Sequence, residues 1–102
     1  MPSRREQLER LLADDPKDPF LRYGLAMECG REGDDARLVE GLEALVKESP
    51  EYIPAYFHCA QGLLRLGRPD EARTVLEQGI AQARRTGDLH AAEEMQGLLG
   101  TI

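Results

Sequence analysis

The chain has 102 residues, which is enough for one small domain with a modest hydrophobic core. Its 41% hydrophobic and 31% charged residues are typical of a globular protein, and its formal net charge of −6 argues against nucleic acid as a partner, because the phosphate backbone would be repelled. No apolar run is long enough to span a membrane, and no apolar stretch of a secretory signal follows the basic N-terminus, so we expect a cytoplasmic protein with no membrane partner.

The composition favours helices over strands. Aromatic residues are only 5% of the chain and Trp is absent, so the core must be built from Leu, Ala and Val. Thr and Ile, which favour strands, are scarce. We therefore expect an all-α protein of about six helices, packed as antiparallel neighbours because the connections between them are short.

The first two helices are bounded by clear capping signals. Ser3 is a predicted N-cap, and Glu6 three residues later completes a capping box for a helix over 3–14. The stretch DDPKDP then ends this helix, because proline lacks the amide hydrogen that a helix interior needs. Asp18 is expected to cap the second helix, with Pro19 in its first turn, and this helix runs to about Gly30.

The third and fourth helices follow turn sequences of the same kind. After GREGDD, either Asp34 or Asp35 is expected to cap the third helix, which ends at ESPEYIP. Gly67 is expected to end the fourth helix in the left-handed conformation. The fourth helix shows the i, i+3, i+4, i+7 apolar pattern in four residues: Tyr56, Cys59, Ala60 and Leu63.

The fifth and sixth helices complete the chain. Pro69 presets the first turn of the fifth helix, and Asp70 and Glu71 suit the positive end of its dipole. Thr86-Gly87-Asp88 stops this helix, and the sixth runs from about residue 88 to 101. The core predicted from all these stripes comprises Leu12, Leu25, Ala26, Leu42, Leu45, Tyr56, Cys59, Ala60, Leu63, Ala72, Val75, Leu76 and Ile80.

An internal repeat becomes visible when the chain is compared with itself at an offset of 34 residues. At this offset Pro16 meets Pro50 and Ala26 meets Ala60. Further along, Gly33 meets Gly67, Leu42 meets Leu76, and Val46 meets Ile80. A period of this length is typical of helix-turn-helix repeats.

The stretch AYFHCAQGLLRLGRPDEARTVLEQGI resembles a tetratricopeptide repeat (TPR), whose pattern Tyr56, Ala60, Gly67 and Ala72 match. The first unit departs from it at two positions, with Arg22 in place of the aromatic residue and Leu38 in place of Ala. The resemblance implies a short right-handed α-solenoid in a single domain, residues 1–102. It divides the chain into an N-terminal capping helix (3–14), repeat 1 (18–50), repeat 2 (51–86) and a C-terminal capping helix (88–101).

No motif for catalysis, a cofactor or a metal ion is found. His58 and Cys59 are adjacent and should face different sides of their helix, and a site made of Cys29, His58 and Cys59 would lack a fourth ligand. GREGDD lacks the Lys-Ser/Thr of a phosphate-binding loop. We expect two buried, reduced cysteines, no cofactor, and a protein that is not an enzyme.

The TPR resemblance implies a concave groove, lined by the first helix of each unit, that holds a peptide or a helix of a partner protein. Tyr23 and Phe57 lie one residue after the packing position, so we expect them to face this groove, and Arg31 and Arg65 could meet a carboxylate at its end. The predicted groove residues are Phe20, Tyr23, Met27, Arg31, Phe57, Gln61, Leu64 and Arg65. Their apolar character differs from the Lys and Asn of the TPR subset that clamps C-terminal carboxylates.

Two functions remain open at this stage. The first is a non-catalytic protein-interaction module that uses the groove. The second is a structural scaffold that self-associates as a weak homodimer through the apolar face of the last helix, along a seam of Leu89, Met95, Leu98, Leu99 and Ile102.

Overall fold

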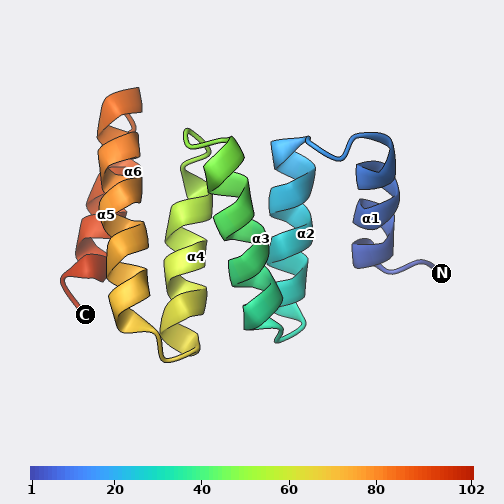
Figure 1. Ribbon diagram of the computed structural model, residues 1–102, viewed down its shortest axis with the longest axis horizontal. Coiled ribbons are helices and arrows are strands. Elements are labelled where there is room, and N and C mark those ends of the chain that lie inside the picture. The colour runs from blue at the N-terminus through green and yellow to red at the C-terminus, as the bar shows by residue number, and fades with distance from the viewer.

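Six helices and no strand make up the computed structural model, which describes all 102 residues. Each helix packs against the next one along the chain, so the helices form a row that measures 42 × 29 × 19 Å (Figure 1). The prediction of an all-α fold with six helices is confirmed. The helices are α1 (Arg4–Asp14), α2 (Pro19–Arg31), α3 (Asp35–Glu48), α4 (Pro54–Arg65), α5 (Pro69–Thr86) and α6 (Leu89–Leu99).

Side-chain caps fix the starts of four helices. Ser3 Oγ accepts a hydrogen bond from the Glu6 amide at 3.1 Å, and the Glu6 carboxylate accepts one from the Ser3 amide, so the predicted capping box is present. Asp18, Asp34 and Asp88 each accept from the amide three residues later, at 3.1 to 3.2 Å. Of the two candidates for the third helix, Asp34 is therefore the cap.

Glycines in the left-handed conformation make the sharp turns after α2, α4 and α5. Gly33, Gly67 and Gly87 have φ angles of 87°, 73° and 82°, a region that favours glycine. Near Gly67 the amide of Arg68 donates a hydrogen bond to the carbonyl of Leu63 at 2.9 Å. This bond provides a partner for one of the free carbonyl groups at the C-terminal end of α4. The turn leaves only Arg68 between Gly67 and the first residue of α5.

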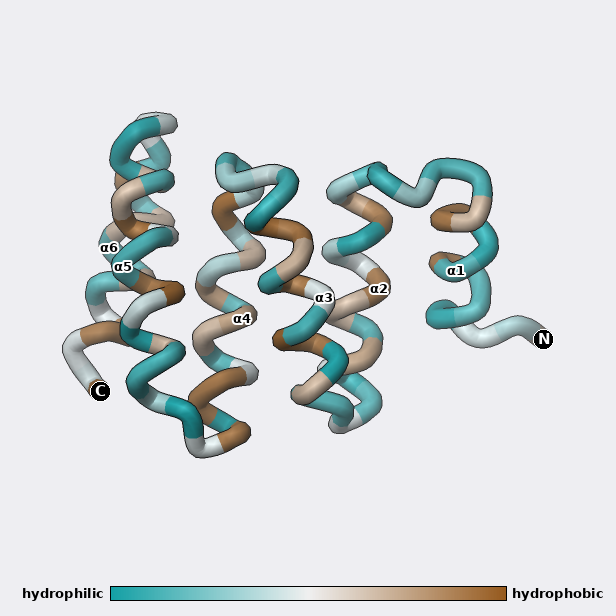
Figure 2. The backbone as a smooth tube through the Cα atoms, viewed as in Figure 1, coloured by the Kyte–Doolittle hydropathy of each residue, from teal (hydrophilic) through white to brown (hydrophobic).

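The hydrophobic residues lie mainly on the helices, and several of the most hydrophobic stretches belong to α3 and α4 (Figure 2). All predicted core residues are buried except Leu12 and Leu25, which are partly exposed. Both line a furrow between α1 and α3, and α1 has a helix on one side only, so that end of the core is left partly open. Buried hydrophobic residues whose burial was not predicted are Leu8, Leu38, Val39, Ile53, Ala55, Ala83, Ala92 and Met95.

In each unit we compare one residue of the first helix with one of the second. In the first unit the small residue is on the first helix and the large one on the second, and in the second unit this order is reversed. In the first unit a Cβ atom on Gly30 would lie 3.0 Å from Leu38 Cδ2, so glycine makes room for leucine. The equivalent positions of the second unit, 34 residues later, are Leu64 and Ala72. Leu38, which departs from the repeat pattern, is thus accommodated by a small residue on the facing helix.

The last helix is held against the core at Gly79. A Cβ atom there would lie 2.6 Å from both Tyr56 Cβ and Met95 Sδ, so three helices meet where glycine has no side chain. Met95 is only 1% exposed. The prediction that Met95 lies in a dimer seam is therefore wrong. Gly79 has no side chain, and Met95 fills the space that this leaves inside the protein.

The packing aromatic of the second unit has a polar counterpart in the first. The Tyr56 hydroxyl donates to the Pro50 carbonyl at 2.6 Å, and the residue is 3% exposed. Arg22, at the equivalent position, instead forms an ion pair with Glu48 near the C-terminus of α3. Both side chains contact the C-terminal end of α3 or the loop that follows it.

Candidate functional site

Helix α4 presents two different sides, and each lines a separate group of pockets. Tyr56 and Cys59 point to one side, toward α3 and α5. Phe57 and Gln61 point to the other side, where α4 lies between α2 and α6. The helical repeat of 3.6 residues causes this separation of adjacent positions.

One pocket lies between α4 and α6, and we call it the acidic pocket. It has a volume of about 320 Å³. Its charged lining includes Asp88 and Glu94, and it contains no Lys or Arg. The lining residues are Ile53, Pro54, Phe57, His58, Asp88, His90, Ala91, Glu94 and Met95.

A second pocket lies between α2 and α4, and we call it the basic pocket. It has a volume of about 350 Å³, two arginines and no Asp or Glu. His58 lines both pockets, so they form one surface, which we call the groove face. The lining residues of the basic pocket are Met27, Gly30, Arg31, Leu38, His58, Gln61 and Arg65.

Four side-chain rings form a connected series that includes Phe57 and His58 of the groove face. The ring centroids of Tyr52 and Tyr23 are 5.3 Å apart, and those of Tyr23 and His58 are 6.0 Å apart. Phe57 meets His58 edge to face at 5.6 Å. His58 and Tyr52 were not among the predicted groove residues. His58 directly follows Phe57 in the sequence, and the Tyr52 ring lies beside that of Tyr23.

The surroundings of His58 favour its neutral imidazole form. Partial burial lowers its pKa below the ordinary value of 6.5, and a hydrogen bond with Gln61 opposes this shift. The charge of Arg65 also lowers the pKa, and the charge of Glu94 raises it. His58 therefore lies within electrostatic reach of both pockets.

Five of the predicted groove residues line the two pockets. Met27, Arg31, Gln61 and Arg65 line the basic pocket, and Phe57 lines the acidic pocket. The structure thus brings residues that are far apart in the sequence onto one surface.

The other three predicted groove residues line neither pocket. Tyr23 packs against the core and reaches the groove face through its contact with His58. Phe20 is 68% exposed at the start of α2, and Leu64 is partly buried against the core.

The two arginines of the basic pocket differ in how they are held. Arg65 Nε donates to Asp35 Oδ1 at 3.0 Å, which orients its guanidinium. Arg31 is 74% exposed, and its nearest acidic atom is Glu28 Oε2 at 3.9 Å. Glu28 is also 3.8 Å from Arg4, so Arg31 has only a weak and shared partner within the chain.

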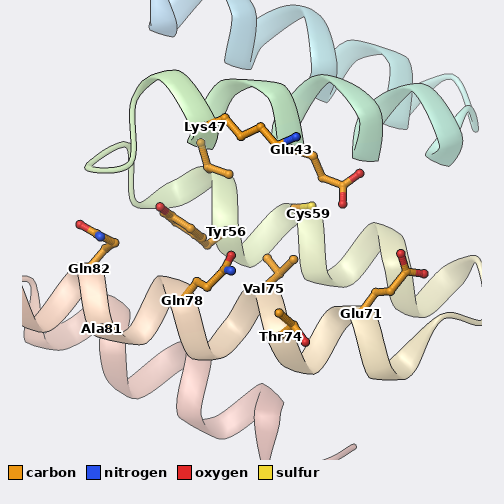
Figure 3. A pocket seen from close by; sticks show the side chains of 11 residues that line it. Glu43, Lys47, Tyr56, Cys59, Glu71, Thr74, Val75, Gln78, Ala81 and Gln82 are labelled. Carbon is orange, nitrogen blue, oxygen red and sulfur yellow. The ribbon is translucent and has the colours of Figure 1, made fainter.

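The opposite side of α4 carries a larger pocket, which we call the outer pocket (Figure 3). It has a volume of about 680 Å³ and lies between α3 and α5. Glu43 and Lys47 on α3 lie across from Gln78 on α5, with Cys59 of α4 between them. Burial raises the pKa of the Cys59 thiol to about 12, so this cysteine is neutral.

The remaining candidate chemistry is sparse. Cys29 and Cys59 are both buried and both free, as predicted. No group of three or more His, Cys, Asp or Glu residues is placed to hold a metal ion. None of the six helices is both long enough and apolar enough to cross a membrane.

Comparison with protein families finds that residues 34–95, which include α3 to α5 and the first part of α6, match the tetratricopeptide repeat model. A TPR repeat-containing protein of Pseudomonas aeruginosa is 33% identical over 90 residues, which cover 88% of this chain and 86% of that protein. The first unit lies partly outside the family match, in keeping with its departures at Arg22 and Leu38.

Solved structures of similar sequence have the same arrangement of helices. A tetratricopeptide repeat domain protein of Salinibacter ruber, solved by crystallography, has a TM-score of 0.77 at 34% identity, over 82% of this chain and 93% of that one. A protein of Bordetella parapertussis, solved in solution, has a TM-score of 0.85 at 27% identity, over 99% of this chain and 88% of that one.

Proposed function

The chain belongs to the tetratricopeptide repeat family, and from this premise we propose that it binds a peptide or a helix of a partner protein on the groove face. TPR folds generally serve as protein-interaction modules, and this proposal assigns no reaction to the domain. The observation that carries it is the continuous surface formed by the acidic and basic pockets, which share His58.

The side chains of this surface suit recognition of another protein. Phe57, Tyr23 and Met27 are partly exposed while they pack against the core, so they are held in place and still available. Aromatic and methionine side chains of this kind supply contact area at protein interfaces. Gln61 and the two arginines add polar groups around them.

Selection from a random peptide library displayed on phage tests this function. We expect the protein to select peptides whose binding is weakened about tenfold or more by Phe57→Ala, because anchor residues at interfaces carry much of the affinity. Gln78→Ala in the outer pocket is the matched control and should leave binding unchanged. The proposal would be contradicted if Phe57→Ala left the affinity for the selected peptides unchanged, or if Gln78→Ala weakened it and Phe57→Ala did not.

Self-association through α6 is the second candidate. Of the proposed seam, Leu89 is 65% exposed, whereas Leu98, Leu99 and Ile102 pack against the core and Met95 is buried. This leaves little apolar surface for a dimer. Light scattering over a range of concentrations separates the two functions, since a scaffold of this kind would show a dimer that Leu89→Gln weakens.

A further inference from the structure

The two pockets of the groove face carry opposite charges. Asp88 and Glu94 line the acidic pocket without any Lys or Arg, and Arg31 and Arg65 line the basic pocket without any Asp or Glu. A partner segment that covers both pockets therefore meets a negative and a positive site in succession. Charge complementarity of this kind sets the register and the partner choice at protein interfaces.

The acidic pocket has the shape and lining to hold a long basic side chain. Ile53 and Met95 at its base are 6% and 1% exposed, and Phe57 forms part of its wall. A Lys or Arg side chain can lay its alkyl stem on this apolar base and keep its charged end at the rim. Its cation would also be attracted to the face of the Phe57 ring.

Glu94 is the carboxylate in this pocket that is free to receive such a cation. Asp88 Oδ1 already accepts the capping hydrogen bond from the Ala91 amide at 3.2 Å. The Glu94 side chain is 55% exposed, and its partner is the exposed His90 at 3.7 Å. This exposed contact is weak, so a Lys or Arg of the partner can replace it.

The basic pocket has the matching features for an acidic side chain. Arg31 has only its weak and shared contact with Glu28, and Asp35 orients the Arg65 guanidinium. Gln61 of α4 lines the same pocket and can donate a hydrogen bond. Two guanidinium groups and an amide together provide more donors than one carboxylate can accept.

The separation of the two pockets along α4 gives a lower limit for the spacing of the charges in the partner. The acidic pocket takes its α4 lining from residues 54–58, and the basic pocket from residues 58–65. The centres of these ranges are about five residues apart, or about 8 Å along the helix axis. An extended chain advances ~3.3 Å per residue, so the two partner residues must be at least about three positions apart.

We propose that the groove face binds an extended segment of a partner protein that carries a Lys or Arg for the acidic pocket and, at least about three residues away, an Asp or Glu for the basic pocket. This inference rests on the proposed function and adds to it the chemistry of the bound segment. The basic residue of the segment lies toward α6, and the acidic residue lies toward α2.

The test uses peptides selected from the random library by the full chain. We expect wild-type protein to enrich peptides with this pair of charges. In binding measurements with a synthesised selected peptide, Glu94→Lys should weaken binding about tenfold, and replacing the basic residue of the peptide by Glu should restore binding to that variant. Glu93→Lys changes the net charge equally from an exposed position outside the pocket, and it should have less than about a twofold effect.

A parallel pair of variants tests the basic pocket. Arg31→Gln should weaken binding of the same peptide about threefold or more, and Arg84→Gln, on the exposed surface of α5, should not. If Glu94→Lys lowers the melting temperature, Glu94→Gln takes its place, with Glu93→Gln as the control.

Three outcomes would overturn the inference. Selected peptides without paired opposite charges, or equal effects of Glu94→Lys and Glu93→Lys, would contradict the charge assignment alone if binding still depends on Phe57. Peptides whose binding ignores Phe57→Ala would contradict the proposed function, and this inference would fail with it.

Discussion

Phe57 and Tyr56 are neighbours in the chain, but α4 turns them to opposite sides. Tyr56 is buried, and its hydroxyl donates to Pro50, whereas Phe57 lines the acidic pocket. The match of Tyr56 to the TPR packing position was sufficient to predict this division. His58 could not be assigned in the same way, because helical spacing separates it from Cys59 but does not show that it contacts Tyr23, a residue 35 positions earlier.

Substitution of these two aromatics should have unequal effects on stability. Tyr56→Ala should lower the free energy of unfolding by roughly 3 kcal/mol or more, because it leaves a cavity and removes a hydrogen bond in the core. Phe57→Ala should cost much less, because the ring is already partly exposed. Urea unfolding monitored by circular dichroism measures both values, and a larger loss for Phe57→Ala would mean that the assigned faces of α4 are exchanged.

His58 should make the stability of the protein depend on pH. Its pKa is lowered in the folded state, so between the ordinary value of 6.5 and the lowered value the unfolded chain binds a proton that the folded chain does not. The free energy of unfolding should therefore decrease as the pH falls through about 6.5. The groups that face this ring are Tyr23, Phe57, Gln61, Arg65 and Glu94.

The control for this pH dependence is His58→Gln, which keeps a polar side chain but cannot titrate. The decrease in unfolding free energy between pH 7.5 and 5.5 should be smaller in this variant than in the wild type. A decrease that is equal or larger in the variant would show that other groups cause the pH dependence.

At the scale of elements, helix positions were predictable because short-range chemistry sets them. Asp caps, prolines in first turns and left-handed glycines act within a few residues, so the second helix, predicted to end near Gly30, ends at Arg31. The packing of the outermost helices depends on contacts between distant residues. The sequence pattern therefore did not reveal that Met95 fills the space above Gly79, or that Leu12 and Leu25 remain partly exposed.

Two helical glycines provide a test of this packing. Gly79→Ala should destabilise the protein by about 1–3 kcal/mol, because its Cβ would lie 2.6 Å from Tyr56 Cβ on a facing helix. Gly97, on α6, has no atom within 4 Å of the corresponding position, so Gly97→Ala should be neutral or stabilise by up to about 1 kcal/mol. Thermal unfolding of both variants measures this contrast, and a Gly79→Ala protein as stable as the wild type would show that α4, α5 and α6 pack less closely.

At the scale of the whole molecule, the row of six helices creates the groove face from residues that are distant in sequence. Met27 of α2, Gln61 of α4 and Glu94 of α6 lie on one side of the molecule because each unit repeats the same helix-turn-helix packing. The 34-residue period and the TPR resemblance predicted this surface in outline. The basic residues Arg31 and Arg65 were predicted to lie on it, but the acidic pocket was not, because its charges come from Asp88 and Glu94 at the last helix.

The central claim is that a partner segment binds on the groove face and not on the outer pocket. The most direct test is to titrate a library-selected peptide into the ¹⁵N-labelled protein and to map the amide chemical-shift changes by NMR. We expect saturable changes concentrated on the groove face, at Met27, Phe57, His58, Gln61 and Glu94, with Glu43 and Gln78 of the outer pocket unaffected. Changes centred on Glu43 and Gln78 would contradict the claim.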